Sequence, residues 1–333
     1  MNATLDQFLV IKKKNEIIQL KMPEINEIQA FPKNIEHLYI PPIKCQGIKS
    51  KLVKFILTNI KWSGKGKWFE PFMGSGVVSF NATPNHAILS DINPYLINFY
   101  TDIQTKKINP NNVREFLELH GNKLSTTGDS TDSYYYEMRD KFNETHESLY
   151  FLFLNRAGFN GLMRFNSKGQ YNTPVGRKPQ RFSKSYITKI VNQINWVQKL
   201  ITTHDYQFKC CSWKKALEEV TESDFVYFDP PYFGRHTTYF DNWGEEENLA
   251  LANFTKTAKC GWAISLWFKN KHRENTFIKE HWADQVIRTN EHYYFIGSKE
   301  DLRTSMMEAL IIKKENATEK SSKINNQYSN YRT

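Results

Sequence analysis

The sequence predicts an α/β protein in which a doubly wound sheet is interrupted by a long, mostly helical insert. Two strand–turn–helix units follow one another at residues 66–80 and 86–100, the usual opening of such a sheet. Helical patterns then dominate residues 106–204, and strand patterns return from residue 206. These observations indicate one α/β domain with an insert.

Each expected element has its own pattern. Residues 48–60 space Leu52, Phe55, Ile56 and Ile60 as on one face of a helix. A strand at 86–91 is followed by a helix that opens near Pro94. Further helices are expected at 131–143, 146–159 and 185–201, and further strands at 206–210, 225–228, 259–268 and 307–314.

These patterns divide the chain into four parts. Residues 1–40 form an N-terminal extension to which the sequence assigns no role, and the α/β domain comprises residues 41–105 and 205–314. The insert spans residues 106–204, and the polar tail at 315–333 is expected to be disordered.

Composition limits the functional classes. The 333 residues carry a net charge of +10, which favours a polyanionic partner. The four cysteines form no C-x-x-C pair, so we expect a reduced, cytoplasmic protein without structural zinc or another metal. The sequence has no signal-peptide pattern and no apolar run near the ~18 residues of a membrane helix, so no membrane association is expected.

The stretch "DFVYFDPPYFGR", residues 224–235, joins a buried strand to Asp229, two prolines and Tyr232. Its plain interpretation is a strand-ending turn with an Asp cap. Alternatively, an amine held by the Asp229 carboxylate and a rigid carbonyl donates two hydrogen bonds and exposes its lone pair. The Tyr232 ring could then stack on a flat base, which suits methylation of an exocyclic amine such as N6 of adenine.

A second motif, "EPFMGSG", places Gly74 and Gly76 at a strand-to-helix turn, where a ligand can approach the backbone. The full G-x-G-x-x-G is absent, so a tight structural turn explains this motif equally well. Asp91 ends the next strand, where an acid can accept hydrogen bonds from ribose hydroxyls or cap the following helix. Together the three residues favour an adenosine-containing ligand.

A third motif, "NRAGFNGLMRFNSKGQYNTPVGR" at 155–177, mixes basic, amide and aromatic residues with glycines. Arg can read guanine, Asn can read adenine, and basic side chains bind phosphates. A solvated basic loop is the alternative interpretation.

In this order, the motifs resemble those of Dam-type (alpha-group) site-specific DNA adenine-N6 methyltransferases, over residues 41–313. The resemblance implies a Rossmann-like mixed sheet that binds S-adenosyl-L-methionine (AdoMet), with an inserted, mostly helical DNA-recognition domain. It also implies double-stranded DNA as the substrate, base flipping of the adenine and no catalytic metal.

The resemblance assigns roles residue by residue. Catalysis is expected at Asp229, Pro230 and Tyr232, and AdoMet contacts at Cys45, Lys49, Phe72, Gly74, Gly76, Asp91, Ser212, Trp213 and Asp229. In the motif "KCQGIK", Cys45 replaces an aromatic residue and Ile48 replaces a glycine of the family pattern.

DNA contacts are expected at Phe159, Asn160, Leu162, Arg164, Asn166, Lys168, Pro174 and Arg177. Phe159 matches the residue that enters the base stack, and Arg164 matches the one that reads guanine in GATC-type sites. Lys178 departs from an aromatic residue seen in some members. The expected site is therefore GATC-like or another sequence beginning with GA.

The sequence is also compatible with other functions. The amine could belong to cytosine N4, RNA or a protein glutamine. Asp at 229 favours adenine, because Ser is common there in cytosine-N4 enzymes and Asn in the glutamine enzymes. A DNA-binding protein without catalysis is a further alternative, which the presence of Asp91, Asp229 and Tyr232 disfavours. A cognate restriction endonuclease that acts on the same site is a possible partner.

Overall fold

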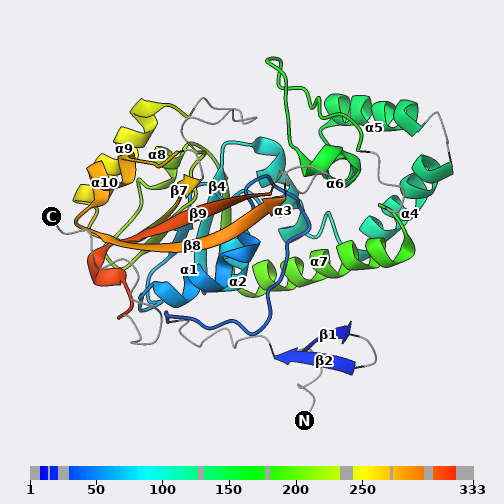
Figure 1. Ribbon diagram of the computed structural model, residues 1–333. Coiled ribbons are helices and arrows are strands. Elements are labelled where there is room, and N and C mark those ends of the chain that lie inside the picture. Colours follow the sequence, from blue (N-terminus) through cyan, green and yellow to red (C-terminus); the bar gives the residue numbers. More distant parts are fainter. Residues whose placement is uncertain are drawn as a thin grey trace, which may run out of the picture.

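A seven-stranded mixed sheet forms the centre of the protein, in the strand order β5-β4-β3-β6-β7-β9-β8 (Figure 1). The computed structural model describes residues 8–13, 16–21, 30–126, 131–176, 181–232, 243–270, 273–295 and 303–319. The strands of this sheet are β3 (Trp68–Glu70), β4 (His86–Asp91), β5 (Asp205–Cys210), β6 (Phe225–Phe228), β7 (Gly261–Asn270), β8 (Val286–Phe295) and β9 (Arg303–Ile312). A separate antiparallel pair is formed by β1 (Phe8–Lys13) and β2 (Glu16–Lys21).

The order of the strands creates a switch point beside β3. From β3 the chain proceeds to β4 and β5 on one side, and later returns as β6 on the other side of β3. These four strands and β7 are parallel, so the carboxyl ends of β3, β4 and β6 meet at one edge of the sheet. In open α/β sheets, ligands bind at this edge and at this break in strand order.

The central strands are buried on both faces because helices cover each side. Successive residues Trp68 and Phe69 of β3 belong to different apolar clusters, as do Tyr227 and Phe228 of β6. One cluster includes residues of α1 (Val53–Asn59), α2 (Val77–Ala82), α3 (Pro94–Gln104) and α7 (Lys184–Thr203). The other includes residues of α8 (Trp213–Ala216), α9 (Glu245–Thr257) and α10 (Phe277–Trp282), which lie together on the opposite face in Figure 1.

The described part of the chain between α3 and β5 contains four α-helices, namely α4 (Pro110–Thr126), α5 (Thr131–Thr145), α6 (Ser148–Ala157) and α7. Figure 1 shows α4, α5 and α6 to one side of the sheet, with α7 reaching from beneath the sheet towards them. Because α7 has twenty residues with a continuous apolar face, it packs against both α3 and α4. No helix of the described ranges is long and apolar enough to cross a bilayer.

Most elements agree with the sequence patterns, with two kinds of difference in this respect. The expected helix at 48–60 is a 3₁₀ turn (η1, Lys49–Lys51) followed by the shorter helix α1, since Leu52 precedes α1 as its N-cap. The elements expected from the sequence do not include β1, β2, α4, α8, α9, α10 and β8. The polar residues of β8, "VIRTNEHYYF", obscure its strand pattern, and its pairing with β9 stabilises it.

Both ends of the α/β domain extend beyond the predicted boundaries. Phe31 is buried, and its backbone pairs with that of Trp62. In the predicted tail, η5 (Lys314–Asn316) and Thr318 are hydrogen-bonded to the backbone of residues 59–61. Part of the extension and residues 315–319 therefore pack on this domain.

Candidate active site

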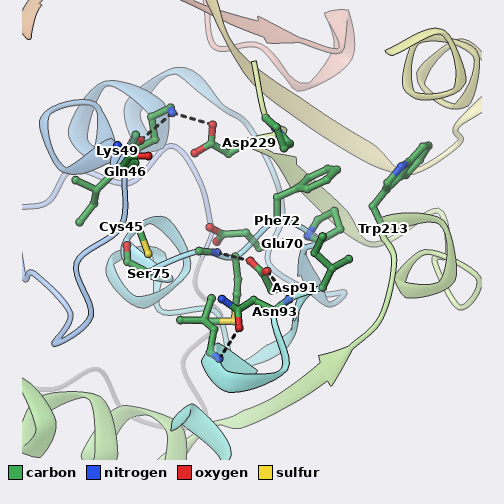
Figure 2. Close-up of a pocket in the computed structure, with 18 of the residues that line it drawn as sticks. Cys45, Gln46, Lys49, Glu70, Phe72, Ser75, Asp91, Asn93, Trp213 and Asp229 are labelled. Carbon is green, nitrogen blue, oxygen red and sulfur yellow. Dashed lines mark hydrogen bonds and ion pairs between the residues drawn. The ribbon is translucent and has the colours of Figure 1, made fainter. Parts of the chain in front are cut away.

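A cavity opens at the carboxyl edge of β3, β4 and β6 (Figure 2). Seven of the predicted AdoMet contacts besides Asp229 line it, which are Cys45, Lys49, Phe72, Gly74, Asp91, Ser212 and Trp213. Asp229 and Pro231 line it as well. The predicted site residues Gly76, Pro230 and Tyr232 are not among its lining residues.

Asp91 braces two turns of the cavity wall. Its Oδ2 accepts a hydrogen bond from the Gly74 backbone N–H at 3.0 Å, and its Oδ1 accepts one from the Asn93 backbone N–H at 3.0 Å. Burial raises the pKa of Asp91, and these backbone donors oppose that rise. The N-cap of α3 is Asn93, whose side chain accepts from Tyr95 and Leu96. The helix-cap interpretation of Asp91 is therefore wrong.

The glycine turn needs its glycines for two physical reasons. Gly74 and Gly76 have φ values of +46° and +70°, in the left-handed region that most side chains avoid. A Cβ on Gly76 would also lie 2.6 Å from the ring of Phe80. The turn thus presents bare backbone to the cavity at the start of α2.

Aromatic rings form another wall of the cavity. Phe72 meets Trp243 edge-on, with ring centroids 5.2 Å apart. Trp213 donates from Nε1 to Glu247 Oε2 at 2.7 Å, which fixes its indole ring. Figure 2 places Trp213 across the cavity from Lys49, with Phe72 between them. This wall can enclose a flat, apolar ring such as adenine.

Lys49 and Asp229 form an ion pair at the other end of the cavity, with Nζ 2.8 Å from Oδ1 (Figure 2). Lys49 Nζ also donates to the Gly47 carbonyl and lies 5.0 Å from the centre of the Tyr232 ring. Burial raises the pKa of Asp229 to about 6, although Lys49 acts in the opposite direction. Burial disfavours the Lys49 charge, but Asp229 and its other neighbours outweigh this and raise the pKa of Lys49 well above its ordinary value.

A third acid, Glu70, lies at the end of β3 and also lines the cavity. Its Oε2 accepts from the backbone N–H and the hydroxyl of Ser79, at the start of α2. Burial raises the pKa of Glu70 to about 8, against the lowering effect of these hydrogen bonds. Glu70 is therefore largely protonated near neutral pH and ties β3 to α2.

The predicted DNA-contacting residues that the structure describes lie on a loop that folds back on itself. Antiparallel bridges join Gly158 to Val175 and Phe165 to Tyr171, and we call residues 158–175 the bridged loop. Asn143 of α5 exchanges two hydrogen bonds with the backbone of Tyr171. Met163 lines the cavity, so the bridged loop adjoins the active site.

Most predicted DNA-contacting side chains of the bridged loop are exposed. Phe159 is 48% exposed although it is a large apolar residue. Asn160, Arg164, Asn166, Lys168 and Pro174 are exposed as well, whereas Leu162 is half-buried. Arg164 is held in place because Nε and Nη2 donate to the side chain and carbonyl of Asn172. Arg177 lies outside the described residues.

A buried arginine supports the start of the bridged loop. Nη1 of Arg181 donates to the carbonyl oxygens of Arg156, Ala157 and Gly158, at the C-terminal end of α6. These carbonyls have no partner within the helix, and a cation there also interacts favourably with the helix dipole. Arg181 thereby fixes the backbone that presents Phe159.

Sequence reasoning missed several residues of the site. Glu70 had a usable signal, because an acid that ends a buried strand before a proline repeats the pattern of Asp229. Trp243, Glu247 and Met163 had no such signal, since tertiary packing alone places them on the cavity. Among the described residues, no group of three or more His, Cys, Asp and Glu side chains is arranged to hold a metal ion.

Residues 46–304 match the family described as D12 class N6 adenine-specific DNA methyltransferase. The chain is 35% identical over 175 residues to the type II methyltransferase M1.LlaDCHI of Lactococcus lactis subsp. cremoris, covering 50% of this chain and 56% of the relative. It is 32% identical over 222 residues to a DNA adenine methylase of Haemophilus influenzae, covering 63% of this chain and 72% of the relative.

A third relative is the type II methyltransferase M.MjaIII of Methanocaldococcus jannaschii, 30% identical over 269 residues, covering 72% of this chain and 86% of the relative. The mixed sheet and its cavity agree with an AdoMet-dependent methyltransferase fold. The chain belongs to the D12 class of N6 adenine-specific DNA methyltransferases.

Proposed function

We propose that this protein transfers a methyl group from AdoMet to N6 of an adenine within a specific short DNA sequence. The adenine would be flipped out of the duplex into the cavity beside Asp229 and Tyr232. One observation carries the proposal: Asp91 and Asp229 open into the same cavity, and the exposed, basic bridged loop adjoins it. Such an arrangement suits a nucleoside cofactor and a DNA base together.

The residues of the cavity fit AdoMet. The bare backbone at Gly74 admits close approach, and Asp91 has lone pairs left for ribose hydroxyls. The aromatic wall at Phe72 and Trp213 suits an adenine ring. When bound, AdoMet supplies an electrophilic methyl group on its sulfonium.

Asp229 would accept hydrogen bonds from the target amine in its carboxylate form. Pro230 and Pro231 fix the backbone after Asp229, so that a carbonyl of this turn can accept the second amine hydrogen. The Tyr232 ring would stack on the flipped base. These contacts would position the amine lone pair for transfer.

The bridged loop would select the DNA sequence. Phe159 would fill the space that the flipped base leaves, and Arg164 would read guanine through its planar fork of donors. Lys168 and Arg177 would bind phosphates, which set the register without reading sequence. The site would be GATC-like or another sequence beginning with GA.

Two of the relatives are named type II methyltransferases. We therefore include in the proposal a cognate restriction endonuclease that acts on the same DNA site.

The decisive experiment is expression in a host that lacks DNA methylation, followed by methylation-aware sequencing of the host genome. We expect N6-methyladenine at one short sequence motif and none in an Asp229→Ala control. Methylation of cytosine N4, or of RNA or protein without DNA methylation, would contradict the proposal. Methylated adenine without a shared motif would contradict its site specificity.

A further inference from the structure

Lys49 lies between two carboxylates. Its Nζ is 2.8 Å from Asp229 Oδ1 and 4.0 Å from Glu308 Oε2. The side chains of Lys49 and Glu308 are only 3% and 2% exposed, so solvent ions screen their interaction weakly. The Lys49 ammonium is thus within ion-pair distance of two carboxylates, Asp229 from the loop after β6 and Glu308 from β9.

The sheet fixes the position of Glu308. This residue lies within β9, where its backbone is level with Trp267 of β7 on one side and with Asn290 of β8 on the other. Its backbone cannot shift without disturbing both ladders. Any adjustment among the three charges is therefore made by side chains, of which Lys49 has the longest, with a flexible four-carbon stem.

The proposed reaction places a demand on these charges. Asp229 would offer its oxygens to the target amine, yet Oδ1 is bonded to Lys49. The amine and the Lys49 ammonium would compete for that oxygen. A buried ammonium that loses its carboxylate is strongly disfavoured unless a second anion is within reach.

We propose that Glu308 is a positioning residue that takes over the Lys49 ammonium when the target amine engages Asp229. This inference rests on the proposed function, because it concerns the same carboxylate. Glu308 would act through Lys49 and would not touch the DNA base.

Several titratable groups near Lys49 and Asp229 affect the pH dependence of the reaction. Tyr227 and Tyr232 lie near Lys49, and Glu70 lies near enough to Asp229 for the Asp229 charge to raise the pKa of Glu70. Burial is the main cause of the raised pKa of Asp229, Lys49 opposes it, and the negative charge of Glu308 adds to it. Removing the charge of Glu308 should therefore lower the pKa of Asp229.

The test is Glu308→Gln, which keeps the shape of the side chain and removes its charge. In single-turnover assays on DNA, the rate of methyl transfer should fall about 10-fold to 10²-fold, the scale of a displaced catalytic group. Affinity for AdoMet should stay unchanged, and the acid limb of the pH–rate profile should move to lower pH. A purely structural defect would lower the rate without this move and would overturn the proposal.

The matched control is Glu315→Gln, the same substitution at an exposed position of η5. We expect it to keep the wild-type rate and pH profile. Dependence on Lys49 is tested in a Lys49→Met background, where Glu308→Gln should cause no further loss of rate. A full additional loss there would overturn the proposal.

A measurement without DNA separates this inference from the proposed function. Aspartates are labelled with ¹³C at the carboxyl carbon, Asp229 is assigned with Asp229→Asn, and its titration is followed by NMR in the free protein. The titration midpoint should be lower in Glu308→Gln than in the wild type, and an unchanged midpoint would overturn the inference. Failure of the proposed function would appear instead as no adenine methylation by the wild type.

Discussion

The cavity and the bridged loop hold their functional side chains in different ways. In the cavity, the buried ammonium of Lys49 contacts the half-buried carboxylate of Asp229 directly, and the pKa values of both groups are raised. In the bridged loop, the backbone is anchored by Asn143, while side chains such as Phe159 are exposed. Substitutions in the cavity therefore disturb contacts between functional side chains. Exposed residues of the bridged loop can be replaced without changing the fold.

This difference predicts that cavity substitutions change the reaction itself and that loop substitutions change which DNA is chosen. The largest effect is expected for Asp229→Ala, which removes the acceptor for the target amine. Methyl transfer should fall at least ~10²-fold, the scale of a lost transition-state hydrogen bond. The measurement is transfer of a tritiated methyl group to plasmid DNA.

The control for that measurement is Asp284→Ala, at an exposed position after α10, which should leave the rate unchanged. A wild-type rate in Asp229→Ala would contradict the role of the carboxylate. It would also remove the distinction between the two regions.

The next largest effect is expected in the bridged loop, for Arg164→Ala. The variant should lose about 1–3 kcal/mol of recognition free energy on the true site, the scale of one bidentate guanine contact. It should also discriminate less between bases at one base pair of the site. Methylation rates are compared on the true site and on each single-base variant of it. If the methylation rate falls equally on every sequence, Arg164 either contacts the DNA phosphates or stabilises the bridged loop, and it does not read a base.

Asp91→Ala tests the cofactor side of the cavity. Two backbone N–H groups lose their acceptor, and the proposed ribose contact disappears, so affinity for AdoMet should fall about tenfold or more. DNA affinity should change little. Calorimetry of the folded variant decides the matter, since unchanged AdoMet affinity would leave Asp91 as a brace of the two turns alone.

The pH dependence should follow Asp229. Its pKa of about 6 means that the carboxylate is protonated below pH 6 and can no longer accept both the amine and Lys49. The rate should therefore be half-maximal near pH 6 and fall about tenfold per pH unit below it. Single-turnover rates between pH 5 and pH 8 measure this, and a flat profile would contradict the need for the carboxylate form.

The smallest effect is expected for Lys168→Ala, on the exposed side of the bridged loop. A lysine that binds a phosphate carries no sequence information, so binding to all duplexes should weaken alike. The slope of log K against log salt should flatten by about one unit. Loss of discrimination at a single base pair would instead place Lys168 in the groove.

The sequence by itself determined the parts of the site that depend on local signals. Asp91 and Asp229 were predicted because each ends a strand that apolar residues define, and a proline or glycine follows nearby. The glycine turn at Gly74 was predicted from its local motif, and most helices and strands were predicted from the spacing of their apolar residues. The family pattern added the contacts of Lys49, Phe72 and Trp213, which lie on the cavity.

The tertiary structure alone decided which distant residues meet these acids. Glu308 lies beside Lys49 because β9 inserts antiparallel between β7 and β8, and nothing in the local pattern of residues 303–312 specifies that pairing. Trp243 and Glu247 line the cavity because α9 packs on the face of the sheet that carries Phe228. The raised pKa values of Glu70 and Asp229 have the same origin, since burial arises only when the separate segments pack together.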